Sequence, residues 1–376
     1  MIPYRDSSVG IIVFIYFSDS SNIFRPRCLC VLELMVLELN NDQRREIINA
    51  RQRYEAWRNA KGREAGFKGS MVWDQTKGHE YLLRSFYDEH GKRRQKSLGK
   101  RSPDTETMKS QFDLERESAI SARKQLDEVT KRQASINRAL NLGRVPLDAA
   151  RVLRALDGHG LLGRGVRVIG TVSLYAYEAA CGVHIDSSVA ATEDIDLLFD
   201  SRRKLRLLAP DEVAAPDLIS MLQRADRSFR TTRRLYRAEN DRGYMVDFTK
   251  PEPSPPWKKS RNSIGASGDL EAAEIEGLSW LENAPDFEQI AVDERGFLLR
   301  IIAVDPRVFA VHKLWLSKQA LRDPIKKLRD REQALTVARL AVEHLQHLPF
   351  NSDALRMLPL EIVESAITEF RQSMQI

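Results

Sequence analysis

The sequence of 376 residues predicts a mixed α/β (α+β) fold, in which a mixed sheet is flanked by helices. Three observations predict it. Residues 146–305 alternate irregularly between strand-like apolar runs and amphipathic segments. Residues 306–376 have a helical hydrophobic period, and residues 41–145 combine charged helical stretches with a basic β-hairpin. A content of 42% hydrophobic and 30% charged residues is typical of a soluble globular protein.

Residues 1–40 are expected to be a disordered or upstream-translated extension. The apolar run at 10–17 is far shorter than the roughly 20 residues that span a bilayer, and no basic n-region or cleavage site indicates a secretory signal. The cysteines Cys28, Cys30 and Cys181 are too few and too poorly spaced for a disulfide framework or a zinc site. We therefore expect a cytoplasmic protein without a membrane partner.

Residues 41–145 are predicted to begin and end with helices, at 42–61 and from Ser102 to about 142. Between them, 70–73, 79–87 and 92–98 are typical of strands, with a turn at 88–91. Basic residues outnumber acidic ones by about nine in 41–144, against a net charge of +6 for the chain. This excess of positive charge favours phosphate contacts with nucleic acid, together with base stacking on aromatic residues. The alternative is a solvated basic face, with aromatic side chains that only pack the sheet; it would give the same sequence pattern. The candidate nucleic-acid-binding residues are Arg84, Lys92, Arg93, Arg94 and Lys96.

Residues 146–305 are predicted to form the central unit. A helix is predicted at 147–156, followed by glycines at 158–163. A dinucleotide-binding loop follows a strand and opens a helix, whereas these glycines follow a helix and precede a strand, so they indicate a helix end and a turn. The strand at 166–169 leads into a tight turn and a helix that ends at Gly182. A hairpin is expected through 287–302, and helices at 309–320, 324–344 and 359–374.

An acidic pair, Asp194 and Asp196, interrupts a strand-like apolar run. Because strand side chains alternate between faces, both carboxylates should project together while Ile195 and Leu197 enter the core. Like charges on one face repel unless a cation compensates, and hard oxygen ligands suit magnesium. Alone, this pattern also occurs in glycosyltransferases, in loops and on solvent-facing strands.

A third acid, Asp247, ends another apolar strand-like run. Three converging carboxylates would bind two magnesium ions, one for the triphosphate of a nucleotide and one for the attacking hydroxyl. Taken by itself, Asp247 is equally typical of an acid in a turn.

Gly170 and Thr171 lie at the predicted helix start, where free backbone amides and a hydroxyl receive phosphates; an ordinary threonine cap is the alternative.

Together these residues resemble the DNA polymerase β-like nucleotidyltransferase superfamily, in which a strand, a glycine motif and a helix precede an Asp-x-Asp pair and a later Asp. Further strings at 170–178, 309–316 and 329–334 look like a bacterial nucleotidyltransferase-like family of poorly defined function. The resemblance implies a polymerase β-like mixed sheet at 146–305. The interval from Thr171 to Asp194 is longer than usual and indicates either an insertion at 182–191 or a coincidental match.

By similarity to abortive-infection toxins, Lys313 and Asp330 are the closest equivalents of a helical Lys and Asp that complete the nucleotide site. A lysine that only snorkels to the surface is the alternative for Lys313. The expected function is metal-dependent transfer of a nucleoside monophosphate from a nucleoside triphosphate to a hydroxyl, with tRNA or another nucleic acid preferred as acceptor over a protein or small molecule. A catalytically silent fold that binds nucleic acid or a partner, and a glycosyltransferase, are the alternatives.

Overall fold

The computed structural model describes residues 36–87, 93–200, 217–253, 255 and 270–374, all within one compact unit, Met35–Ile376. The predicted extension up to residue 35, the turn at 88–91 and Lys92 lie outside the described residues. The strands are β1 (Val36–Glu38), β2 (Ser70–Thr76), β3 (His79–Tyr87), β4 (Arg93–Lys100), β5 (Val166–Ile169), β6 (Val183–Ile185), β7 (Asp194–Phe199), β8 (Arg230–Thr231), β9 (Arg237–Glu239), β10 (Met245–Pro251), β11 (Ala273–Ile275), β12 (Asp286–Val292) and β13 (Leu298–Val304).

The helices agree with most of the predicted ones and begin or end a few residues away from them. The α-helices are α1 (Asn41–Gly66), α2 (Pro103–Ala139), α3 (Leu147–Gly158), α4 (Leu174–Cys181), α5 (Ser187–Ala190), α6 (Leu218–Ala225), α7 (Leu278–Asn283), α8 (Pro306–Ser317), α9 (Pro324–His344) and α10 (Leu360–Met374), and the 3-10 helices are η1 (Thr171–Ser173) and η2 (Asp353–Leu355). Among the described helices, none has the length and apolar composition to cross a membrane.

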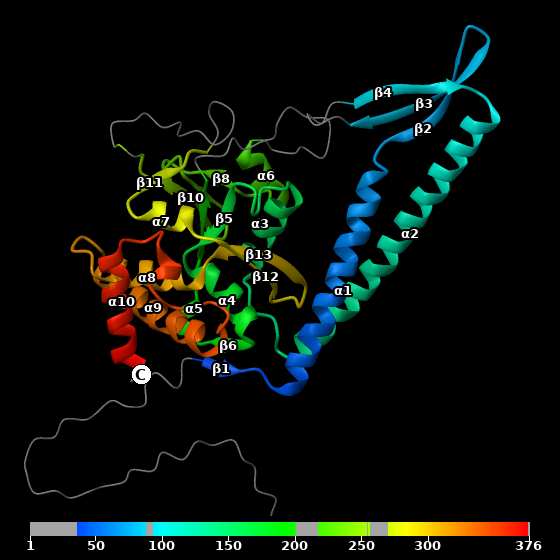
Figure 1. Cartoon of the computed structure of the whole chain (residues 1–376). Helices are drawn as coiled ribbons and strands as arrows, with labels where there is room; N and C mark the ends of the chain where they lie inside the picture. The colour runs from blue at the N-terminus through cyan, green and yellow to red at the C-terminus, as the bar shows by residue number, and fades with distance from the viewer. Residues whose placement is uncertain (1–35, 88–92, 201–216, 254, 256–269, 375–376) are drawn as a thin grey trace, which may run out of the picture. The chain divides into compact units, whose positions relative to one another are not determined.

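A mixed sheet forms the centre of the fold, as predicted. Its strand order is β12-β13-β5-β7-β10-β9-β8, with β11 also paired to β10. Strand β7 runs antiparallel to β5 and parallel to β10, and β10 runs antiparallel to β9. Helices surround this sheet: α3 packs on β13, α4 on β12 and α7 on β10 (Figure 1). The alternate apolar residues of β7 and β10, such as Ile195 and Val246, are completely buried.

The folded unit begins earlier than the sequence predicts. Residues 36–40, assigned above to the extension, contribute β1 and the helix cap of α1. Strand β1 pairs antiparallel with β6, and Asn40 forms a capping box with Gln43. Strand β6 and α5 lie within 182–191, so this stretch forms ordered elements between the glycine turn and the acidic pair.

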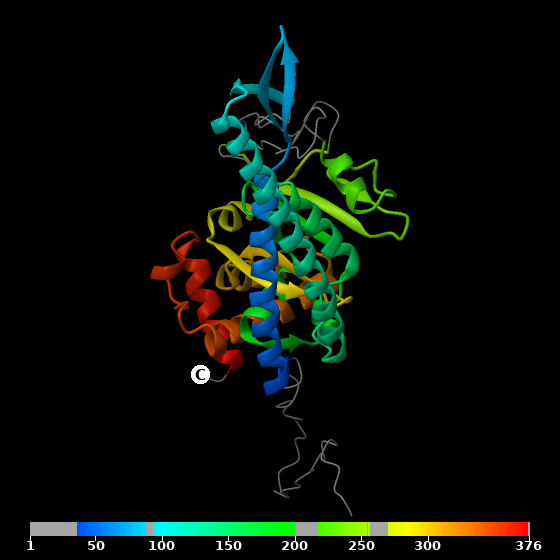
Figure 2. The same cartoon turned by 90° about the vertical axis from the view of Figure 1, so that its right-hand side faces the viewer.

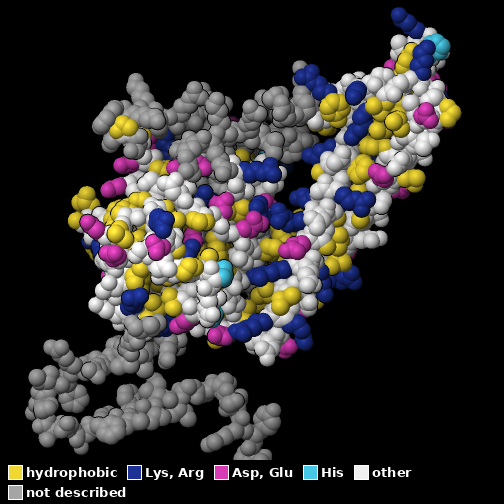
Figure 3. Space-filling model, in the orientation of Figure 1, with side chains coloured by type: hydrophobic (Ala, Val, Ile, Leu, Met, Phe, Trp, Pro, Cys, Tyr) yellow, Lys and Arg dark blue, Asp and Glu magenta, His cyan; other side chains and the backbone are white. Residues whose placement is uncertain are grey.

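Helices α1 and α2 run side by side, and the three-stranded sheet β2-β3-β4 connects them (Figures 1 and 2). The predicted hairpin is therefore part of a three-stranded sheet, whose first strand extends to Thr76. Ser102 caps α2 in a capping box with Thr105, as its position before a proline favours. Lys and Arg side chains are spread along this helix pair and its sheet (Figure 3).

The C-terminal end of α2 contacts the central unit through buried polar groups. Asn137 Nδ2 donates to the Gly296 carbonyl oxygen at 2.7 Å, and Gln133 Nε2 donates to Asn137 Oδ1 at 2.9 Å. Gly296, in the turn between β12 and β13, has a φ of 84°, and a Cβ there would lie 2.1 Å from the Ala134 carbonyl oxygen. Close backbone approach at Gly296 therefore determines how α2 docks.

Candidate functional site

The three predicted carboxylates lie on the same face of two adjacent strands. In the parallel pairing of β7 with β10, Asp196 is in register with Asp247 and Asp194 with Met245. Residues paired across a sheet, and residues two apart on one strand, project from the same face. Ile195 and Leu197, in contrast, point into the core and are completely buried. The period-2 alternation of the sequence thus gathers the acids on one side.

Gly170 brings the backbone directly against this acidic face. It follows β5, whose Ile169 pairs with Asp196, and it has a φ of 68° and a ψ of −157°. A Cβ at this position would lie 2.2 Å from Asp196 Oδ2. Only glycine combines this backbone conformation with such close approach to a carboxylate.

Thr171 starts η1, which continues into α4, and Gly182 ends α4 in the left-handed conformation, as predicted. The Thr171 side chain is not engaged as a helix cap. Instead, Gln333 Nε2 on α9 donates to Thr171 Oγ1 at 3.2 Å and to the Val189 carbonyl oxygen at 3.0 Å. Because Thr171 Oγ1 accepts this bond, its own proton is left to donate to an incoming anion.

On the acidic face, burial and neighbouring charges destabilise the ionised form of Asp196. Burial, followed by the nearby Asp194 and Asp247 charges, raises the pKa of Asp196 to about 7, while Lys313 and Lys326 act in the opposite direction. The strand keeps this side chain partly open to solvent. A carboxylate destabilised by burial and by a second carboxylate is stabilised by a bound cation.

Lys313 and Asp330, the two predicted helical residues, contact each other. Lys313 Nζ on α8 donates to Asp330 Oδ1 on α9 at 2.7 Å, and Arg322 Nε donates to Asp330 Oδ2 at 2.8 Å. Lys313 is 9% exposed and Asp330 3% exposed, so Lys313 is not a snorkelling surface lysine. This ion triad carries a net positive charge, because one carboxylate neutralises only one of its two cations, and the Lys313 charge acts on Asp196.

Asp247 has a guanidinium partner. Arg237 Nε donates to Asp247 Oδ1 at 2.7 Å, and Arg237 Nη2 donates to Oδ2 at 2.6 Å. These hydrogen bonds raise the pKa of Arg237 above its usual value. Asp194 Oδ1, in contrast, accepts a hydrogen bond from the neutral Thr192 hydroxyl.

The donor set fits a cation at one part of the acidic face and not at another. Asp194 and Asp196 supply carboxylate oxygens, the ligands that magnesium prefers, and Asp196 lies beside Gly170. Both oxygens of Asp247 already accept from Arg237. Within the described ranges, no group of three or more His, Cys, Asp or Glu side chains is arranged to hold a metal ion.

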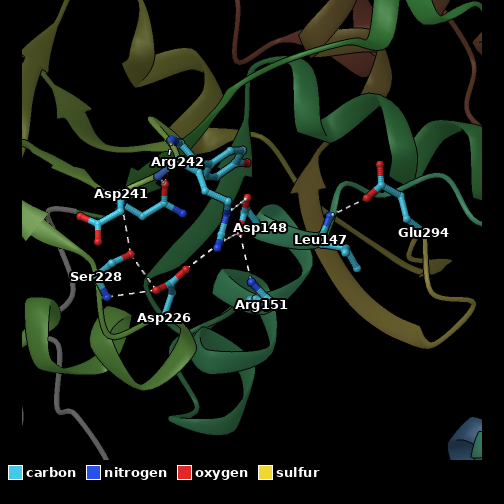
Figure 4. A network of polar contacts seen from close by, with 10 residues as sticks. Leu147, Asp148, Arg151, Asp226, Ser228, Asp241, Arg242 and Glu294 are labelled. Carbon is cyan, nitrogen blue, oxygen red and sulfur yellow. Dashed lines mark hydrogen bonds and ion pairs between the residues drawn. The ribbon is translucent and has the colours of Figure 1, made fainter.

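An open pocket of about 490 Å³ lies next to the segments that enter β7 and β10, and Thr192, Glu193 and Tyr244 contribute to its wall. Figure 4 shows the ion-pair network at this pocket: Arg242 bridges Asp148 on α3 and Asp226 at the end of α6. The Arg242 Nη2 to Asp226 Oδ2 distance is 2.6 Å. Because Arg242 lies in the loop that enters β10, this network fixes the start of the strand that carries Asp247.

The predicted nucleic-acid-binding residues differ in their surroundings. Arg93 and Lys96 on β4 are exposed. Arg94, also exposed, is in register with Phe86 on β3. Arg84 stabilises the fold itself, because its Nη2 donates to the Lys68 carbonyl oxygen at 3.0 Å and its guanidinium lies 4.5 Å from the centre of the Phe112 ring. Lys92 lies outside the described residues.

Sequence reasoning missed Gln333, Arg237 and Arg322, which contact the predicted site residues. Gln333 lies one helical turn after Asp330, and this spacing was a usable signal, because residues three apart on a helix share a face. Arg237 has no such signal, since it meets Asp247 only through the pairing of β9 with β10.

A mixed sheet that presents acids beside a glycine turn and a helix start is typical of proteins that handle nucleoside phosphates. A family model described as a nucleotidyltransferase matches residues 148–359, more than half of the chain. The chain therefore belongs to this nucleotidyltransferase family, and the matched range includes all the predicted catalytic and nucleotide-binding residues. The comparisons with curated proteins and with solved structures gave no match.

Proposed function

We propose that this protein is a metal-dependent nucleotidyltransferase of the polymerase β-like type, which transfers a nucleoside monophosphate from a nucleoside triphosphate to a hydroxyl and releases pyrophosphate. The observation that carries the proposal is the register of β7 with β10. It gathers Asp194, Asp196 and Asp247 on one face, next to Gly170. Membership of the nucleotidyltransferase family supports the reaction class.

In this proposal, Asp194 and Asp196 hold magnesium, which supplies charge neutralisation at the phosphates when it is bound. The Gly170–Thr171 turn receives the phosphates, because the first amides of η1 have no helical acceptor and Gly170 offers no side chain to obstruct approach. The Thr171 hydroxyl donates to a phosphate oxygen, oriented by Gln333. Lys313, held by Asp330, supplies positive charge beside Asp196.

For the acceptor we propose tRNA or another nucleic acid in the cytoplasm. Exposed Arg93 and Lys96 on β4 offer phosphate contacts, and Phe86 is 36% exposed on the neighbouring strand. Basic side chains interleaved with aromatic rings favour single-stranded nucleic acid through charge and base stacking. We do not include Arg84 among the proposed nucleic-acid contacts, because its guanidinium packs on the Phe112 ring.

The test is incubation with labelled nucleoside triphosphates, magnesium and total cellular RNA. We expect label transfer by the wild type, and at least a hundredfold less by Asp196→Asn, which keeps the shape of the side chain but removes a metal-binding charge. Asp353→Asn is the matched control, because Asp353 is an exposed acid on η2 and its loss should leave transfer unchanged. Transfer by Asp196→Asn at the wild-type rate would exclude the proposed site.

The engagement of Asp247 by Arg237 favours one alternative, a catalytically silent transferase fold that binds nucleic acid or a partner. It predicts RNA binding that weakens with salt, persists in Asp196→Asn and is accompanied by no label transfer in the wild type. The same incubation, followed by a filter-binding measurement of RNA, separates the two functions.

A further inference from the structure

Arg237 is built into the acidic face by the sheet itself. In the antiparallel pairing of β10 with β9, Asp247 stands directly opposite Arg237. Directly opposed residues of an antiparallel pair project from the same face, with their Cβ atoms about 5 Å apart. The contact therefore follows from strand register and does not depend on one chance side-chain rotamer.

The contact uses the whole carboxylate. The two parallel bonds, Nε to Oδ1 and Nη2 to Oδ2, form a bidentate fork, the strongest type of charge-assisted pairing between these groups. Only 22% of the Arg237 side chain and 10% of the Asp247 side chain are exposed, so water screens the pair weakly. A divalent ion at Asp247 would lie within a few ångströms of the guanidinium and be repelled by it.

Asp194 and Asp196 have different neighbours. Asp194 accepts from the neutral hydroxyl of Thr192, and Asp196 lies against Gly170, which has no side chain. Lys313 and Lys326 act on Asp196 and Arg237 acts on Asp194 through space, but among the described residues neither carboxylate forms a direct ion pair, so their oxygens remain available to a cation. The three carboxylates are therefore divided into a pair that suits a metal ion and a third that already has a cation.

We propose that Arg237 takes the place of a second divalent cation. The site then holds one ion, between Asp194 and Asp196, and the guanidinium supplies the positive charge at Asp247. This inference rests on the proposed function and revises the two-ion arrangement expected from the three acids. It also explains how three carboxylates share one face, because Asp247 is already paired with a guanidinium.

The test counts protein-bound Mn²⁺ by electron paramagnetic resonance, with Mn²⁺ alone and again with a non-hydrolysable nucleoside triphosphate analogue. We expect one protein-bound ion per chain in the wild type and a second in Arg237→Gln, which frees Asp247. Arg237→Lys keeps a cation opposite Asp247 and should remain at one. Arg230→Gln, which removes an exposed arginine of the neighbouring edge strand β8, is the matched control and should also remain at one.

The outcomes separate this inference from the proposed function. Two bound ions in the wild type, or no second ion in a folded Arg237→Gln variant, would overturn the role of Arg237 and leave the transferase proposal intact. If Arg237→Gln does not fold, a second ion in Arg237→Lys would overturn the inference, because that variant retains the charge that should exclude it. If the wild type binds no Mn²⁺, or Asp194→Asn binds as much as the wild type, the metal site itself fails.

Discussion

At Gly170 the chain turns with a φ of 68°, and the Asp196 carboxylate lies against its α-carbon. Gly182, at the end of α4, has the same φ of 68°, but a Cβ added there would meet no neighbouring atom within 4 Å. The two glycines share a positive φ, but Gly170 has a ψ of −157° and Gly182 a ψ of 42°. They therefore differ in backbone strain as well as in what a side chain would meet, and Gly182 serves as the control for the positive φ alone.

We expect Gly170→Ala to reduce label transfer at least tenfold, because the added methyl displaces the Asp196 carboxylate. Gly182→Ala should keep the activity. Both variants should lose roughly 1 kcal/mol or more of unfolding free energy because alanine disfavours a positive φ, and Gly170→Ala should lose more, because its ψ of −157° lies outside the left-handed helical region and its Cβ would meet Asp196. Urea unfolding and the transfer assay measure both quantities, and equal activity in the two variants would contradict the assigned role of Gly170.

His312, next to Lys313 on α8, is a buried residue that titrates abnormally. Its ring lies near those of Trp280 and Trp315, and its Nε2 atom is buried without a hydrogen-bond partner. Burial, followed by the positive charge of Lys313, lowers its pKa to about 3 from 6.5. Between these values the unfolded chain binds a proton that the folded protein excludes, so His312 reduces stability as pH falls below 6.5, until about pH 3.

We expect the wild type to lose about 2 kcal/mol more unfolding free energy between pH 7 and pH 5 than His312→Phe, which keeps an aromatic ring but does not titrate. Urea unfolding of the two proteins at both pH values gives this difference. Equal losses would show that His312 is protonated in the folded protein or exposed to water.

At the scale of elements, the docking of α2 on the β12–β13 turn depends on one backbone approach. Gly296 has no room for a Cβ because of the Ala134 carbonyl oxygen, and its own carbonyl accepts from Asn137. Gly243, in the turn before β10, has a similar φ of 79° and open space around it. It therefore serves as the matched control for Gly296.

Gly296→Ala should release the C-terminal end of α2 from the central unit, whereas Gly243→Ala should not. We expect hydrogen exchange to become at least tenfold faster in α2 near Asn137, with unchanged protection in β7 and β10. Loss of the buried hydrogen bond between Asn137 and Gly296 costs about 1–3 kcal/mol, which accounts for an effect of this size. Unchanged exchange in α2 would mean that this contact does not hold the helix.

At the scale of the whole molecule, charge is divided unevenly. Residues 41–144 carry about nine excess positive charges, and since the chain has a net +6, the remaining residues carry about three excess negative ones. The excess therefore lies on the helix pair and the three-stranded sheet, at a distance along the chain from the acidic face. This division favours separate roles, with nucleic acid bound by the first region and chemistry carried out in the second.

We expect RNA affinity to fall with salt, and the double variant Arg93→Gln/Lys96→Gln to reduce the slope of log affinity against log salt by about 1.4, or about 0.7 for each phosphate contact. The matched control is Arg356→Gln, an exposed arginine next to η2. Filter binding at several salt concentrations measures the slopes. Equal slopes in both variants and the wild type would exclude β4 as the binding surface.

The sequence by itself determined the mixed α/β fold class, most helices and strands, and the shared face of Asp194 and Asp196. These are local properties, because hydrophobic period and capping residues act within a few positions along the chain. Ser102 predicted the start of α2, and the alternation at Ile195 and Leu197 predicted the buried face of β7. The glycine turn before Thr171 was predicted in the same way.

Only the tertiary structure decided which distant residues meet. The pairing of β7 with β10 brings Asp247 next to Asp196, and the pairing of β9 with β10 places Arg237 opposite Asp247. Likewise, the packing of α8 on α9 joins Lys313 to Asp330. Strand register and helix packing depend on the free energy of the whole chain, since a one-residue shift in pairing would turn every side chain of a strand to the other face.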